Sequence, residues 1–135
     1  MNKTAAKEWL RKVYHDLKSA QILYEANHFT DSIGVDLHYA IEKAFKTFLA
    51  YQNKKIPKTH NLLELNELNS KYLLLQEEEI RLLHITNRYH IEATYPQYDR
   101  SMPSREEIKE VLEFAEELFN DVCKILDIEK REVMV

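Results

Sequence analysis

The chain of 135 residues contains a single glycine. Average usage would give about nine. Glycine is the residue that enters left-handed turns and lets the backbone approach phosphates closely. Its scarcity argues against P-loops, dinucleotide-binding turns, EF-hand loops and hairpin-rich sandwiches or barrels, which place glycine at fixed positions. Prolines are also few, so the composition favours long helices with few joints.

Cysteine and long apolar runs are scarce as well. The single Cys123 can form neither an internal disulfide nor a multi-cysteine zinc site, and we expect it to pack as a small hydrophobe in a helix. No apolar run is long enough to span a membrane, and the charged N-terminus lacks the apolar stretch of a secretory signal. These features predict a cytoplasmic protein with no membrane segment.

Apolar residues spaced three and four apart predict four main helices. We expect a short fifth helix in the stretch HNLLELNEL, which follows the break at Pro57. The predicted fold is all-α, an antiparallel up-and-down bundle of four main helices plus one short helix. The main helices are expected from about Thr4 to Ala26, from a cap at Thr30 or Asp31 to about Tyr51, from about Leu73 to Ala93, and from a cap at Ser104 to Ile125.

The chain shows no internal repeat, low-complexity tract or interdomain linker. Its mass of 16.2 kDa fits a single domain over residues 1–135. We expect residues 1–3 and 129–135 to fray, although the valines and the methionine of the C-terminal stretch could dock on the bundle.

The second expected helix has an unusually wide apolar face that includes polar residues. Its apolar residues cover about half of the circumference, more than one contact between two helices requires. We therefore expect it to lie centrally, or also to face a second subunit. His38 falls within the apolar arc, and Glu42 and Lys46 follow one and two turns later. These residues could orient a ligand or line an interface, or His38 could sit in the core with Glu42 as its partner.

Charge is distributed unevenly along the chain. Between Lys43 and His60 there are five lysines and no acidic residue, whereas between Ser104 and Lys130 nine acidic residues face four basic ones. The lysine-rich strip could receive phosphate groups, and the acidic helix would repel nucleic acid. The alternative interpretation is that the lysines only keep a loop solvated.

A second candidate region is the segment NRYHIEATYPQYDR. It combines arginines, which match phosphate geometry, with tyrosines, which stack on bases, and with a histidine. This combination suits a nucleotide or single-stranded RNA. Polar aromatic clusters also occur where a helix end is wedged against its neighbours, so both interpretations stay open. The residues concerned are Asn87, Arg88, Tyr89, His90, Tyr95, Tyr98 and Arg100.

Metal sites and nucleophiles find little support. A di-iron bundle needs two Glu-x-x-His motifs, and only Glu25 to His28 has that spacing. There is no His-Glu-x-x-His motif, and no Gly-x-Ser-x-Gly elbow can be built with one glycine. We therefore expect no metal, no cofactor and no catalytic nucleophile.

The stretch DLHYAIEKAFKTFLAYQNKKIPKTHNLLEL, followed by YHIEATYP, resembles the HEPN domain. The resemblance runs through nearly the whole chain and is strongest in the second expected helix and the Lys-Thr-His-x-Leu turn at Lys58 to Leu62. HEPN domains are all-helical, often form homodimers, and either pair with minimal nucleotidyltransferases or act as ribonucleases. The resemblance thus implies a helical bundle with a nucleotide-binding or RNA-directed role.

The chain departs from the ribonuclease members of this family. Those members carry an arginine and a histidine separated by four to six residues near the start of the late helix. Relatives often also have Arg-Tyr-Pro where this chain has Thr94, Tyr95 and Pro96, which removes one phosphate contact. The Arg-to-His pairs here have other spacings: Arg11 to His15, Arg81 to His84, Arg81 to His90 and Arg88 to His90.

The leading hypothesis is a non-catalytic, nucleotide-binding or regulatory helical protein that dimerises and acts with a minimal nucleotidyltransferase partner, as in a toxin-antitoxin module. The lysines and Arg88 would contact phosphate, Tyr95 would stack on a base, and His38 with Glu42 would orient the site. The alternatives are a metal-independent ribonuclease toxin with an altered motif, using His84 or His90 as acid or base, and a purely structural dimerisation module. The candidate ligand-binding residues are His38, Glu42, Lys46, Lys58, His60, Arg88, His90 and Tyr95.

Overall fold

The computed structural model describes residues 1–92 and 102–135, so Tyr95, Tyr98 and Arg100 lie outside the described residues. Every regular element in these ranges is helical, which confirms the all-α prediction. None of the described helices is long and apolar enough to cross a membrane. The elements are α1 (Lys3–Glu25), α2 (Thr30–Tyr51), α3 (Leu62–Leu68), α4 (Glu77–Glu92), α5 (Arg105–Ile125) and a 3-10 turn, η1 (Lys130–Glu132).

Asparagine and aspartate end the long helices where glycine commonly does. Asn27, Asn53 and Asp127 follow α1, α2 and α5 with φ angles of 56°, 58° and 54°. This left-handed conformation is the usual end of a helix, and short polar side chains tolerate it better than other non-glycine residues do. The chain can therefore make its helix ends with almost no glycine.

Side chains cap the starts of α1, α3 and α5. Helix α2 instead begins directly after Phe29 with no side-chain cap, so the cap expected at Thr30 or Asp31 is wrong. Ser104 accepts a hydrogen bond from the Glu107 amide at 3.1 Å, as the sequence predicts. The expected cap Thr4 instead lies inside α1, and Asn2 accepts from the Ala5 amide at 3.0 Å. Asn61 caps α3, so the short helix begins later than the sequence suggests.

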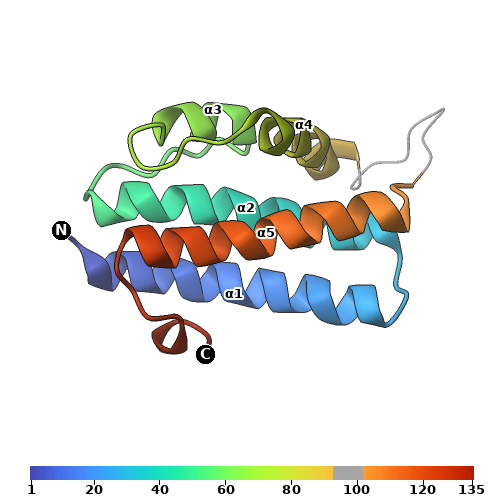
Figure 1. Ribbon diagram of the computed structural model, residues 1–135, viewed down its shortest axis with the longest axis horizontal. Coiled ribbons are helices and arrows are strands. Elements are labelled where there is room, and N and C mark those ends of the chain that lie inside the picture. The colour runs from blue at the N-terminus through green and yellow to red at the C-terminus, as the bar shows by residue number, and fades with distance from the viewer. Residues whose placement is uncertain (93–101) are drawn as a thin grey trace.

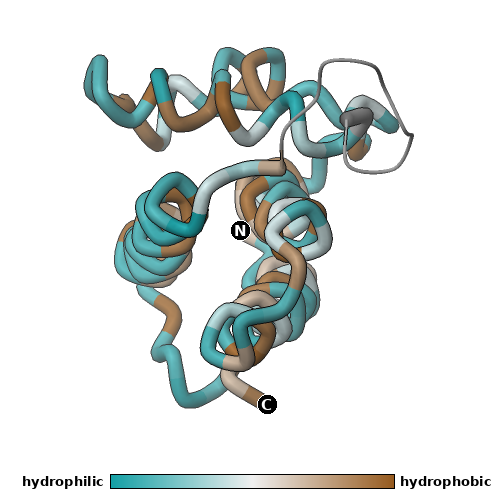
Figure 2. Tube along the Cα trace, turned by 90° about the vertical axis from the view of Figure 1, so that its right-hand side faces the viewer, coloured by the Kyte–Doolittle hydropathy of each residue, from teal (hydrophilic) through white to brown (hydrophobic). Residues whose placement is uncertain are grey.

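Helix α2 lies at the centre of the molecule. It runs beside α1 and α5, while α3 and α4 form a second layer on the side of α2 away from α1 (Figure 1). The side view shows the same two layers (Figure 2). Fifteen of the 22 residues of α2 are buried, and Phe45 is fully enclosed. Its wide apolar face is thus covered within the chain, and a second subunit is not needed to explain it.

Parts of the terminal stretches, residues 1–3 and 129–135, contact the bundle, whereas Met1, Met134 and Val135 are exposed. The Asn2 amide donates to the Tyr51 carbonyl at 2.9 Å, which ties the start of α1 to the end of α2. At the other end, Val133 is fully buried and Glu132 pairs with Lys7. Burial of an apolar side chain and an ion pair hold the C-terminal segment beside α1.

The single glycine, Gly34, allows α4 to approach α2 closely. A Cβ atom at this position would lie 2.9 Å from Cδ2 of Tyr89, a distance that such contacts essentially never show. Tyr89 is 5% exposed, and its hydroxyl donates to Glu107 at 2.5 Å, so its ring has little room to move. Gly34 therefore serves helix packing.

We predict that Gly34→Leu lowers the free energy of unfolding by about 2 kcal/mol or more, because the new side chain collides with the Tyr89 ring. Chemical denaturation monitored by circular dichroism measures this change. The control is Ser32→Leu, an exposed position in the same helix, which should change stability by only about 0.5 kcal/mol. Equal effects of the two substitutions would contradict the packing role.

Candidate functional site

Five of the eight candidate residues come together in one place, which we call the histidine cluster: His38, Glu42, Lys46, His60 and His90. The first three lie four residues apart on α2, which places them on one side of the helix. His60 lies in the loop before α3, and His90 lies in the last turn of α4. The cluster therefore joins the central helix to the second layer.

Glu42 is the anchor of the cluster. Its side chain is 5% exposed, and it accepts a hydrogen bond from Lys46 Nζ at 2.9 Å while its other oxygen lies 2.8 Å from His60 Nδ1. Burial acts to raise the pKa of Glu42, but the hydrogen bonds from Lys46 and His60 outweigh burial and hold the pKa below its ordinary value. The carboxylate is thus ionised at neutral pH and compensated on both oxygens.

The ionised carboxylate determines how His60 presents its ring. Because a carboxylate only accepts hydrogen bonds, Nδ1 of His60 must carry the hydrogen that it donates to Glu42. The side chain of His60 is half exposed. Its second nitrogen, Nε2, therefore remains to accept a hydrogen bond or, when protonated, to donate one.

The imidazole rings are in contact with one another. His60 and His90 stack with ring centres 4.3 Å apart and planes at 22°, and His38 lies 5.0 Å from His90. Tyr39 meets His90 edge-on at 5.9 Å. Three histidines packed this closely disfavour simultaneous protonation, because their positive charges would repel.

His38 is the most deeply buried member. It is completely shielded from solvent, and neither ring nitrogen makes a hydrogen bond of ordinary geometry within the described residues, although an interaction with the backbone of His60 acts to raise its pKa. Its Nδ1 lies 3.6 Å from Oε1 of Glu42, the partner expected from the sequence, which is within ion-pair range but too long for a hydrogen bond. Both oxygens of that carboxylate are already engaged by Lys46 and His60. Burial lowers the pKa of His38 to about 4, and burial together with the charge of His60 lowers the pKa of His90.

The other candidate residues do not join this cluster in the same way. Lys58 is exposed two residues before His60. Arg88 is exposed on α4, but two residues of a helix are about 200° apart around its axis, so it points to a different side from His90. Arg81, which the ribonuclease alternative would use, is bound by Glu78 and Glu110.

Asn87, which is not one of the eight candidate residues, helps to position the site. Its side-chain oxygen accepts from the Leu62 amide at 2.8 Å, and its nitrogen donates to Asn61 at 3.2 Å. These bonds hold α4 against the start of α3, and so fix His90 relative to His60. In the sequence, Asn87 stands in a polar aromatic segment. Its partners, Leu62 and Asn61, are more than 20 positions away, so the sequence alone could not identify them.

The cluster is not arranged as a metal centre. Within residues 1–92 and 102–135, no three histidine, cysteine, aspartate or glutamate side chains are placed to hold a metal ion. The stacked geometry explains why, since rings lying face to face do not direct their nitrogens at one point.

These features define an all-helical bundle with a polar cluster at the contact between its central helix and its second layer. The HEPN domain model matches residues 6–126, and the chain belongs to the HEPN family. The family resemblance of the sequence is thereby confirmed.

Two solved structures share the fold. TT1696 from Thermus thermophilus is 22% identical, with a TM-score of 0.77, and the match covers 93% of this chain and 99% of that one. ST0689, an archaeal HEPN homologue, is 17% identical, with a TM-score of 0.67, and the match covers 92% and 98% of the two chains. No curated protein matches the chain.

We predict that the folded protein loses stability as the pH falls from 6.5 to about 5, and that His38 accounts for much of the loss. Its pKa is about 4 in the folded chain and 6.5 ordinarily, so the unfolded chain binds more protons in this range. The contribution of His38 is roughly 2 kcal/mol between these pH values. Glu42 acts only at lower pH, because its pKa lies below 4.5.

Denaturation of His38→Leu at a series of pH values measures this contribution. The slope of stability against pH should become shallower than in the wild type, with a remainder from His90. The matched control His84→Gln removes an exposed histidine of α4 and should keep the wild-type slope. A wild-type slope in His38→Leu would show that the buried imidazole does not resist protonation.

Proposed function

We propose that this HEPN protein is a non-catalytic nucleotide-binding or regulatory protein that receives the phosphate groups of its ligand at the exposed side of the histidine cluster. The observation that carries the proposal is the stacked pair of His60 and His90, which stands on the buried Glu42–Lys46 pair beside a lysine-rich loop. The imidazole of His60, fixed in place by Glu42 and by stacking on His90 next to lysines, can offer an N–H donor to an anion.

The roles of the residues follow from their exposure. Lys58 is exposed and can contact a phosphate, and Nε2 of His60 can donate to one once it is protonated. Lys46 is 5% exposed and bound to Glu42, so it supports the site without touching the ligand. His38 and Glu42 contact His60 and His90 from the buried side of the cluster and hold them in place.

A ribonuclease receives less support from the geometry. Its chemistry needs a cation beside the histidine that acts as acid or base, to stabilise the negative charge on the oxygens of the phosphorane. Arg81 is held by two glutamates, and Arg88 projects from another side of α4 than His90. The described residues therefore favour binding over cleavage.

The proposal includes a homodimer and a minimal nucleotidyltransferase partner, as in a toxin-antitoxin module. Its support is membership of the HEPN family, whose members often dimerise and in part pair with such enzymes. Since the apolar face of α2 is covered within the chain, these contacts would use the outer faces of other helices.

We predict that tripolyphosphate binds the wild-type protein and that Lys58→Gln weakens this binding about threefold to tenfold, as expected for loss of one exposed cation near a polyanion. Isothermal calorimetry at low salt measures the affinity. His60→Gln should also weaken binding, because it removes the imidazole that can become charged.

The matched control is Lys18→Gln, which removes the same charge from an exposed position on α1, the helix on the far side of α2 from α3 and α4. It should leave the affinity within about twofold of the wild type. Equal weakening by Lys18→Gln and Lys58→Gln would mean that only net charge matters, and that the cluster is not the site.

A further inference from the structure

A groove between α1 and α2 lies outside the histidine cluster. Its volume is about 410 Å³, and its described lining residues are Glu8, Trp9 and Lys12 of α1 with Lys43 of α2. This volume is within the range of small-molecule sites. Trp9 is the only tryptophan of the chain and is partly exposed, so an aromatic face is available at the surface.

Cationic and aromatic side chains alternate along this surface. Lys43 Nζ lies 5.6 Å from the centre of the Tyr39 ring and forms a 2.7 Å ion pair with Asp16, which fixes its position. Lys12 is exposed at the side of the groove. A tryptophan face beside two lysines suits a planar aromatic group that carries negative charge elsewhere in the molecule.

Tyr39 lies between Lys43, a lining residue of the groove, and the histidine cluster. Tyr39 contacts Lys43 on one side and meets the ring of His90 at 5.9 Å on the other. Two contacts of less than 6 Å thus connect the lining of the groove to the stacked imidazoles. A nucleoside triphosphate is long enough to reach across them.

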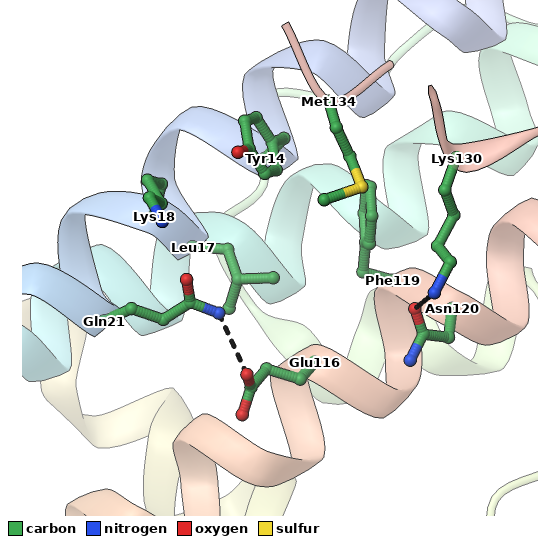
Figure 3. Close-up of a pocket in the computed structure, with 9 residues that line it drawn as sticks. All are labelled: Tyr14, Leu17, Lys18, Gln21, Glu116, Phe119, Asn120, Lys130 and Met134. Carbon is green, nitrogen blue, oxygen red and sulfur yellow. Dashed lines mark hydrogen bonds between the residues drawn. The ribbon is translucent and has the colours of Figure 1, made fainter. Parts of the chain in front are cut away.

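A second groove, between α1 and α5, offers a contrast. It measures about 260 Å³, and Figure 3 shows two pairs of its polar side chains joined by hydrogen bonds. Gln21 donates to Glu116 at 2.9 Å, and Lys130 donates to Asn120 at 3.0 Å. The side chain of Met134 lies against Phe119 in the same view. Four of its polar side chains are thus paired with one another, and no contact described within residues 1–92 and 102–135 joins its lining to the histidine cluster, so the observations favour the Trp9 groove as the ligand site.

We propose that the Trp9 groove is the base subsite of a nucleotide whose phosphates lie at the histidine cluster. The base stacks on Trp9, Lys43 and Tyr39 lie along the sugar and the first phosphate, and the terminal phosphates reach His60 and Lys58. The inference rests on the proposed function, because the cluster must first bind phosphate. It adds the place at which the base of the nucleotide binds.

The fluorescence of Trp9 reports directly on this subsite, since no other tryptophan contributes. ATP is the probe, with adenosine and tripolyphosphate as its separated halves. We expect ATP to quench the emission with saturation, adenosine to quench it at higher concentration, and tripolyphosphate to leave it unchanged. Tripolyphosphate quenching equal to that of ATP would overturn the subsite.

The second part of the test uses substitutions, and calorimetry measures the affinities of the variants for ATP and tripolyphosphate. Trp9→Leu keeps an apolar side chain and removes the stacking face. We expect it to lower the affinity for ATP about fivefold to a hundredfold, the range for one stacked base. Its affinity for tripolyphosphate should not change. Tyr14→Leu, which removes a partly buried ring of α1 at the other groove, is the matched control and should leave both affinities unchanged.

The outcomes separate the two proposals. If tripolyphosphate binds and responds to Lys58→Gln while ATP binds Trp9→Leu as well as the wild type, the base subsite is wrong and the phosphate site stands. If neither ATP nor tripolyphosphate binds the wild-type protein, both fail. Circular dichroism of Trp9→Leu shows that any loss of binding is not a loss of fold.

Discussion

The buried carboxylate of Glu42 is the group on which the arrangement of the site depends. A buried ionised group must be compensated, and removing one partner of such a pair costs more than the pair itself contributes. Lys46 from the same helix and His60 from the loop before α3 provide the compensation. The loop is thereby held on α2, and through the stacked rings of His60 and His90 so is α4. The histidines are consequently positioned by a structural requirement of the core.

The scarcity of glycine has two separate consequences in this fold. Helix ends use asparagine and aspartate in the left-handed conformation, which leaves no glycine-rich loop where backbone amides could surround a phosphate. The one glycine lies where Tyr89 presses against α2. Any phosphate site must therefore be made by side chains or helix termini, and the cluster is a place where the described residues bring suitable side-chain donors together.

Much of the fold could be predicted from the sequence, because apolar spacing alone indicates long helices and the width of the face of α2 indicates a central position. Which residues meet one another at the candidate site could not be predicted in this way. The spacing of His38, Glu42 and Lys46 placed them on one side of a helix, but only the packed chain brings His60 and His90 to that side. Arg88 was expected to contact phosphate from its closeness in sequence to His90, yet helix geometry turns it elsewhere. The exposed fraction of Lys46 depends on how the loop before α3 folds back onto α2. Its burial there makes Lys46 a supporting residue, and this could not be predicted from the sequence.

The central claim is that the histidine cluster binds phosphate, and the chain carries its own controls. Three of its six histidines, His38, His60 and His90, belong to the cluster, whereas His15, His28 and His84 lie outside it. Nuclear magnetic resonance of the imidazole groups during titration with tripolyphosphate distinguishes them in one sample. The account predicts saturable shifts for His60 and His90, a smaller shift for the buried His38, and none for the other three. Equal shifts of all the exposed histidines, or shifts of His15, His28 and His84 alone, would contradict it.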